Sequence, residues 1–162
     1  MTRTHNFTPT ILLVFIMTTI CVCGQKEIKK SVNATFTKQV KGGSLTIDTF
    51  TSFPPEIDGC SCCFSNNSTE LKKEKYIYVN DFAQTSFLNI NGVMTKFTQT
   101  ELKKINKTTV IAKFKSKNYE MTIEVKDGKQ SGEETSIKTG TITLTDKKGN
   151  TITRNFYGEC GC

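Results

Sequence analysis

The sequence predicts an all-β protein, a small antiparallel meander folded into a barrel or a sandwich of about eight short strands. Apolar and polar residues alternate in several short runs, as they do along half-buried strands. Gly, Asn, Asp and Pro clusters separate these runs about every 8 to 15 residues. No amphipathic helix of ordinary length is visible. These three observations favour a chain of hairpins.

The order of the strands follows from the position of these runs. Leu45, Ile47 and Thr49 alternate as a strand would, and Pro54-Pro55 ends it. A polar stretch at 65–68 predicts a turn. In the run 75–79, Tyr76 and Tyr78 alternate with Ile77 and Val79, so we expect the two tyrosines on an exposed face. The dipeptide Asn91-Gly92 separates two strand-like segments and tolerates positive φ at both positions, which predicts a type I′ hairpin.

The second half of the chain contains the clearest alternation. Residues 100–106 predict a helical turn or a long loop, and a strand resumes with Val110, Ala112 and Phe114. Along 119–125 apolar residues alternate with polar ones, and Asp127-Gly128 predicts the end of that strand. Ile142 and Leu144 continue the pattern. Residues 147–150 predict a turn, and a last strand leads from Ile152 into the terminal cysteines.

We predict three segments: a signal peptide at 1–24, a flexible stretch at 25–43 and one β domain at 44–162. Arg3 gives a positive start, an apolar run follows at 11–17, and small residues precede a cleavage point before Gln25. The apolar run is shorter than the about 20 residues of a membrane-spanning helix. Cys21 and Cys23 offer an alternative, a lipoprotein anchored to the outer membrane or envelope. Either route predicts a periplasmic, envelope-attached or secreted protein.

The remaining cysteines form two clusters, at 60–63 and 160–162. On extended strands Cys60 and Cys62 share a face, and so do Cys160 and Cys162, because side chains alternate with period two. Two neighbouring strands of this kind can form two disulfides, the usual fate of paired cysteines outside the cytoplasm. Their connectivity is open. Cys63 points to the other face and is left over, free for an intermolecular bond.

A metal site is the alternative for these four cysteines. The thiolates of Cys60, Cys62, Cys160 and Cys162 could surround Zn²⁺ or Cu(I). However, Cys-x-Cys pairs are a weaker zinc signature than Cys-x-x-Cys pairs. An exported protein also seldom keeps four thiols reduced.

The net charge and the glycosylation sequons indicate what the surface of the protein is like. The formal net charge of +7 falls to +6 when Arg3 leaves, with 21 basic against 15 acidic residues, and the basic ones are mostly scattered lysines. Scattered lysine indicates a solvated surface and predicts no specific nucleic-acid partner. Five Asn-x-Ser/Thr sequons, at Asn6, Asn33, Asn66, Asn67 and Asn106, could accept glycans in a eukaryotic secreted protein.

Enzymatic chemistry is poorly supported. The only histidine, His5, leaves with the signal peptide, and histidine-based general acid–base, nucleophilic and metal chemistry leaves with it. Glu120 and Glu124 could form a glycosidase pair, but they share the solvent face of a strand. The turn Asp146–Asn150 has lysines where a calcium loop would place ligands. We expect no catalytic residues and no cofactor.

A binding module is the functional hypothesis that remains. A barrel of about eight strands is filled by its own side chains or holds one small ligand. The aromatic residues could line a pocket or belong to the core: Tyr76, Tyr78, Phe82, Phe87, Phe97, Phe114, Tyr119 and Tyr157. The sequence identifies no ligand, protein partner or oligomeric state.

In size, export signal and cysteine-linked meander, the chain resembles the small periplasmic lysozyme-inhibitor barrels. Ser131-Gly132 and Lys138-Thr139-Gly140 are similar to the Ser-Gly and Lys-Gly elements of their inhibitory loops, although the aromatic residues of that pattern are absent. This resemblance implies inhibition of a lysozyme-type hydrolase, which is a further alternative function.

Overall fold

The structure is a computed structural model that describes residues 44–162. The predicted signal peptide, the flexible stretch and Cys21 and Cys23 lie outside these residues. The described part is nearly all β: nine strands and a single four-residue helix, α1 (Ser68–Leu71). The all-β prediction is confirmed, and of the two predicted architectures the fold is the barrel.

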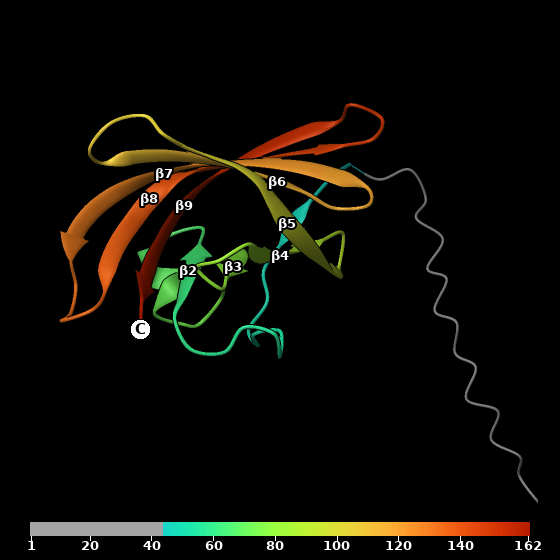
Figure 1. Ribbon diagram of the computed structural model, residues 1–162. Helices are drawn as coiled ribbons and strands as arrows, with labels where there is room; N and C mark the ends of the chain where they lie inside the picture. Colours follow the sequence, from blue (N-terminus) through green and yellow to red (C-terminus); the bar gives the residue numbers. More distant parts are fainter. Residues whose placement is uncertain (1–43) are drawn as a thin grey trace, which may run out of the picture. The chain divides into compact units, whose positions relative to one another are not determined.

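Eight of the strands close into an up-and-down barrel (Figure 1). They are β2 (Ser61–Ser65), β3 (Tyr78–Asn80), β4 (Thr85–Ile90), β5 (Val93–Lys104), β6 (Thr109–Lys115), β7 (Tyr119–Gln130), β8 (Ser136–Asp146) and β9 (Thr151–Gly161). Each strand pairs antiparallel with the next, and β9 pairs with β2 to close the ring. The short β1 (Ile47–Asp48) pairs with the end of β4.

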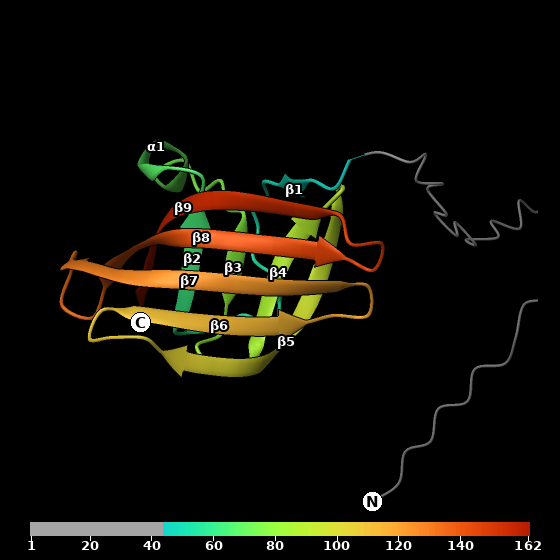
Figure 2. The same ribbon diagram turned by 90° about the horizontal axis from the view of Figure 1, so that it is seen from above.

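The strands differ in length, and this gives the barrel two layers. Figure 2 shows the long strands from β5 to β9 side by side, crossing over the short β2, β3 and β4. β5 pairs with β4 through residues 93–98 only, and a register shift between Gln99 and Glu101 precedes its second half, which pairs with β6 alone. The long layer therefore extends beyond the short one.

Side chains fill the interior of the barrel. Inward-facing residues of all eight strands form one buried cluster, including Leu88, Phe97, Ile123 and Leu144. At its centre Phe64 stacks on Phe156, with ring centroids 4.1 Å apart. A separate cluster of Phe50, Ile57, Val79 and Phe87 buries the outer face of β3 and β4 beneath the preceding loop. The centre of the barrel is thus filled by packed side chains, as is usual for small barrels.

Several local predictions are wrong. Residues 100–104 are strand, with 105–108 as the turn, because they pair with β6. β7 continues through Asp127-Gly128 to Gln130, with a register shift that absorbs the glycine. Tyr78 is 1% exposed, since its side chain enters the barrel. Tyr76 is half-buried against Phe50 and Phe53.

The hairpin prediction is confirmed. Asn91 and Gly92 have φ values of 50° and 77°, so both lie in the left-handed region, as a type I′ turn requires. The flanking strands pair in register from Ile90 with Val93 outward. The predicted turn at 65–68 leads into α1, whose N-cap is Asn67.

Candidate functional site at the mouth of the barrel

Three short turns meet at one end of the barrel, which also holds the longer β2–β3 connection, because the strands run alternately up and down. They connect β4 to β5 (91–92), β6 to β7 (116–118) and β8 to β9 (147–150). We call this the cavity end. The opposite end, which we call the disulfide end, contains the start of β2, the end of β9 and the β5–β6 and β7–β8 turns.

Each turn at the cavity end is held by its own side chains. Asp146 accepts hydrogen bonds from the backbone N–H groups of Lys148 and Asn150, at 2.8 and 2.9 Å, and from Asn150 Nδ2 at 2.8 Å. The oxygen of Asn91 accepts from the N–H and the hydroxyl of Thr46, both at 2.8 Å, which fastens the segment before β1 to the hairpin. These contacts give the end of the barrel a defined shape.

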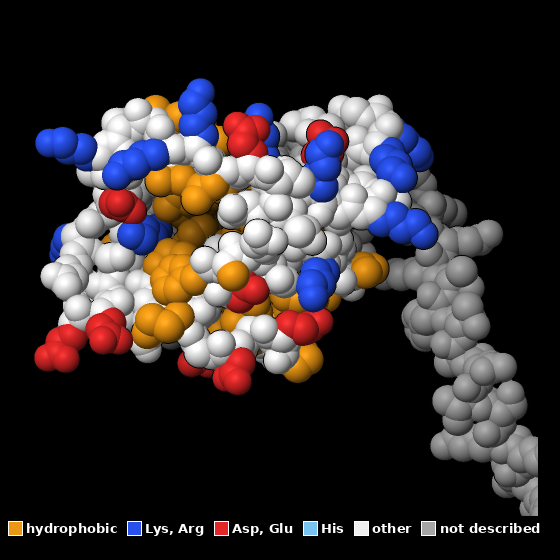
Figure 3. Space-filling view, viewed as in Figure 1, with side chains coloured by type: hydrophobic (Ala, Val, Ile, Leu, Met, Phe, Trp, Pro, Cys, Tyr) orange, Lys and Arg blue, Asp and Glu red, His pale blue; other side chains and the backbone are white. Residues whose placement is uncertain are grey.

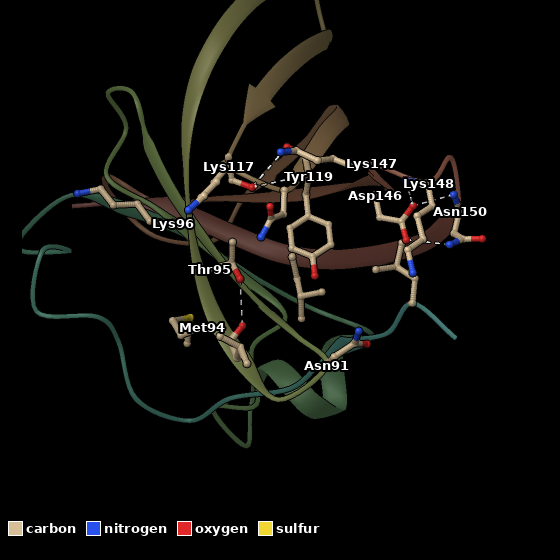
Figure 4. A pocket seen from close by; sticks show the side chains of 15 residues that line it. Asn91, Met94, Thr95, Lys96, Lys117, Tyr119, Asp146, Lys147, Lys148 and Asn150 are labelled. Carbon is tan, nitrogen blue, oxygen red and sulfur yellow. Dashed lines mark hydrogen bonds between the residues drawn. The ribbon is translucent and has the colours of Figure 1, made fainter. Parts of the chain in front are cut away.

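Between the turns lies a cavity of about 670 Å³, here called the mouth cavity (Figure 4). Its apolar wall consists of Leu45, Ile90, Val93, Met94 and Tyr119. Val93 is 59% exposed and Met94 39%, so the wall is open to solvent. In Figure 4 the ring of Tyr119 lies in the middle of the lining side chains, between the hairpin and the β8–β9 turn.

The polar part of the mouth cavity is mostly basic. Its charged residues are Lys96, Lys117, Lys147, Lys148 and Asp146. Hydrogen bonds, first of all from Asn150, lower the pKa of Asp146, so this carboxylate stays ionised and is already engaged by its own turn. Among residues 44–162, no ion pair within 4.0 Å involves the three lysines other than Lys96. Their charges are available to a bound anion.

The cysteines meet at the disulfide end, as predicted. An outer disulfide joins Cys60 to Cys162 and an inner one joins Cys62 to Cys160, with Cα–Cα distances of 4.1 and 4.0 Å. Cys62 and Cys160 are also direct partners in the β2–β9 register. The two crosslinks therefore fasten the first and last strands of the barrel where the ring closes.

The thiolate site does not form in this oxidised state. All four sulfurs are consumed in disulfides. Elsewhere in the described part of the chain, no group of three or more His, Cys, Asp or Glu residues is arranged to hold a metal ion.

Cys63 is the one free cysteine among residues 44–162. It lies on the outer face opposite Glu159 in the register, half-buried. Burial, assisted by the charge of Glu159, raises the pKa of Cys63 to about 11. A thiol of this kind is a poor nucleophile near neutral pH.

The residues that resemble inhibitory-loop elements have structural contacts. Lys138 forms an ion pair with Asp127 at 2.7 Å, and its side chain is only 16% exposed. A Cβ on Gly140 would collide with the carbonyl oxygen of Glu124, so this glycine permits close packing of β7 and β8. Ser131 donates a hydrogen bond to Glu159. Lys138 and Gly140 are thus engaged within β8, whereas Ser131 and Gly132 lie exposed in the β7–β8 turn.

The two candidate carboxylates remain on the outer face. Glu120 pairs with Lys115 at 3.1 Å and Glu124 with Lys126 at 3.4 Å. Neither of them lines the mouth cavity.

Of the eight aromatic residues considered as pocket residues, only Tyr119 lines the mouth cavity. Tyr78, Phe97 and Phe114 belong to the core, and Phe87 to the outer cluster. Phe82 is 49% exposed. Sequence reasoning did not single out Val93 and Met94, although the Asn91-Gly92 hairpin signal placed them at a strand start.

Comparison with known proteins identifies no relative. No protein-family model, curated protein sequence or solved structure matches the chain. Within residues 44–162, no helix has the length and apolar character needed to cross a membrane.

Proposed function

We propose that this protein is an exported, non-enzymatic binding module that holds a small amphipathic anion at the mouth of its barrel. The observation that carries the proposal is the mouth cavity, which combines an apolar wall with four lysines and one already engaged carboxylate. Its volume of about 670 Å³ lies within the range typical of small-molecule sites.

The shape of the site favours a ligand with two parts. The apolar part would rest on Val93, Met94 and Tyr119 at the mouth of the barrel. An anionic group would then lie among the ammonium groups of Lys117, Lys147 and Lys148. Because these lysines belong to two different turns, a ligand that contacts all three would bridge them.

Export is supported by the crosslinks, since two disulfides are typical of oxidising compartments. Whether the protein is secreted, periplasmic or attached to an envelope depends on residues before 44. A binding role is supported by the mouth cavity, whose lining brings apolar side chains together with lysines.

The test is a titration followed by NMR, with dodecanoate as the anionic probe and dodecyltrimethylammonium as its cationic counterpart, both below their micellar concentrations. We expect dodecanoate to shift backbone signals at 93–96, 117–119 and 147–150, and the cation to bind more weakly. The double variant Lys117→Glu, Lys147→Glu should weaken dodecanoate binding about tenfold, since an exposed charge pair is worth up to about 1 kcal/mol.

The matched control is the double variant Lys103→Glu, Lys129→Glu, which changes the net charge equally at two exposed lysines near the disulfide end of β5 and β7 and should change the affinity less than about twofold. Equal loss in both variants would show that only the overall charge matters. Shifts confined to other surfaces would mean that the mouth cavity is not the site. Either result would overturn the proposal.

A further inference from the structure

Three of the predicted sequons lie in the described part of the chain, and their asparagines differ in what they do in the fold. An N-linked glycan attaches to the side-chain nitrogen, Nδ2, and needs open space around it. Asn66 donates a hydrogen bond from Nδ2 to Glu70 at 2.7 Å. Asn67 is the N-cap of α1, and its side-chain oxygen accepts from the N–H of Glu70 at 2.9 Å. Both residues thus help to form the start of α1, and of the two only Asn66 uses its Nδ2 in a hydrogen bond.

Asn106 lies instead on the β5–β6 turn at the disulfide end. Its side-chain oxygen accepts hydrogen bonds from Thr108, from the N–H at 2.9 Å and from the hydroxyl at 3.2 Å. Thr108 is the hydroxyl residue of the sequon. No hydrogen bond from Nδ2 of Asn106 to another described residue is formed, and residues 106–108 are all exposed. The turn therefore holds the amide by its oxygen and leaves its nitrogen open.

The surroundings of Asn106 contain exposed apolar surface. Leu102 is 63% exposed and Ile105 47%, more than most of the other large apolar residues in the described chain. Leu102 pairs with Ala112, an inward-facing residue, on the half of β5 that β4 does not cover. In Figure 3 hydrophobic side chains also gather in a hollow on the left of the molecule, the side on which Figure 1 shows the β5–β6 turn. A sugar chain rooted at residue 106 would screen this surface from water and from other molecules.

We propose that Asn106 is an N-glycosylation site of the exported protein. The donor is a lipid-linked oligosaccharide diphosphate, and a transferase of the secretory pathway carries out the reaction. A bond forms between Nδ2 of Asn106 and C1 of the first sugar, the C1–O bond to the phosphate breaks, the amide loses one proton, and the lipid diphosphate leaves. The proposal rests on the export that forms part of the proposed function. It is independent of the mouth cavity, which lies at the opposite end of the barrel.

The test is secretion of the full chain from a eukaryotic host, followed by intact mass and N-terminal sequencing. The protein is then treated with peptide-N-glycosidase in heavy-oxygen water, so that each asparagine that carried a glycan becomes labelled aspartate. We expect the label at Asn106. Asn106→Gln and Thr108→Ala should each lose one glycan mass, whereas Thr108→Ser should keep the site occupied and Asn67→Gln should leave it unchanged. Thr108→Ala is included as a second variant that removes the sequon, so that a folding defect caused by Asn106→Gln is not mistaken for loss of the glycan.

Two results would overturn the inference, and they are distinguishable. Secreted protein with a cleaved leader and an unlabelled Asn106 would refute the glycan alone, whether or not Asn66 or Asn67 is labelled. A chain that stays in the cell with its leader attached would refute export, and the glycan with it. We also expect the deglycosylated protein to scatter more light at high concentration than the glycosylated form, because Leu102 and Ile105 become accessible.

Discussion

The two disulfides are nested, and this arrangement predicts that their contributions to stability are strongly coupled. The inner crosslink joins residues 98 apart and the outer one residues 102 apart. Either alone closes a loop of nearly the whole domain. Once one is formed, however, the other closes only a small ring that runs from residue 60 to 62 and from 160 to 162. The second crosslink therefore restricts the unfolded chain far less than the first.

The magnitude follows from the entropy of loop closure. Closing a loop of about 100 residues stabilises the fold by about 4.7 kcal/mol, and closing a ring of about six residues by about 2.2 kcal/mol. Replacing Cys60 and Cys162 by alanine should then cost about 2 kcal/mol while the inner pair remains. Replacing Cys62 and Cys160 should cost about 1 kcal/mol more, because these two side chains are buried in the core.

The coupling is measured by a cycle of four proteins: the parent, each paired alanine variant and the four-alanine variant, all with Cys63→Ala to prevent exchange. The free energy of unfolding is measured by urea titration. All four proteins are measured in the same concentration of sulfate, which stabilises the folded state, so that the weakest variant is folded before urea is added. We expect the four-alanine variant to lose about 2.5 kcal/mol more than the two paired variants combined. Additive costs, with each pair contributing its full long-loop value, would refute the reasoning.

Two further predictions concern the same closure of the ring. Cys63, with its pKa raised to about 11 from 9.0, should react with iodoacetamide about 100-fold more slowly at pH 8 in the folded than in the unfolded protein. The Glu159→Gln variant should react faster, because the neighbouring negative charge is gone; an unchanged rate in the variant would contradict this. Gly158→Ala should cost about 2 to 3 kcal/mol in urea unfolding, since its Cβ would meet the Phe64 ring and the Cys63 carbonyl. Asn155→Ala on the exposed face of β9 is the control, and equal costs would argue against the clash.

The barrel could be predicted because the strand signals are local. Alternation along 119–125 specifies one buried face regardless of the neighbouring strands, and the structure buries Met121 and Ile123 as that pattern requires. The cysteine parity similarly predicted that both sulfurs of each cluster share a face. The register that selects Cys62 with Cys160 is a property of the β2–β9 pair, so the sequence left the connectivity open.

The errors occur where a tertiary contact outweighs a local preference. Residues 100–104 have no alternation of apolar and polar side chains, yet they form strand because β6 supplies backbone partners. Tyr76 and Tyr78 alternate with Ile77 and Val79, and this pattern suggested that the tyrosines lie on an exposed face. The prediction failed because both sides of this run are buried. Val79 is covered from outside the barrel by the outer cluster, whereas Ile77 and Tyr78 belong to the inner core, where Tyr78 packs against Phe64. Alternation cannot distinguish the two faces of a strand that is buried on both.

The mouth cavity illustrates a different limit of sequence reasoning. Its lining comes from segments separated by up to about 100 residues, and no motif connects Leu45 to the turn at 147–150. What joins them is the up-and-down connectivity: two strands separate each of these turns from the next, so the turns lie at the same end of the barrel. Given the hairpin at Asn91-Gly92 and a strand count, one could have inferred that the lysines at 117, 147 and 148 share an end of the barrel. Residues 100–104 were not recognised as part of a strand, so the number of strands between these turns was uncertain. Without that number the sequence could not show that the three lysines lie at the same end of the barrel.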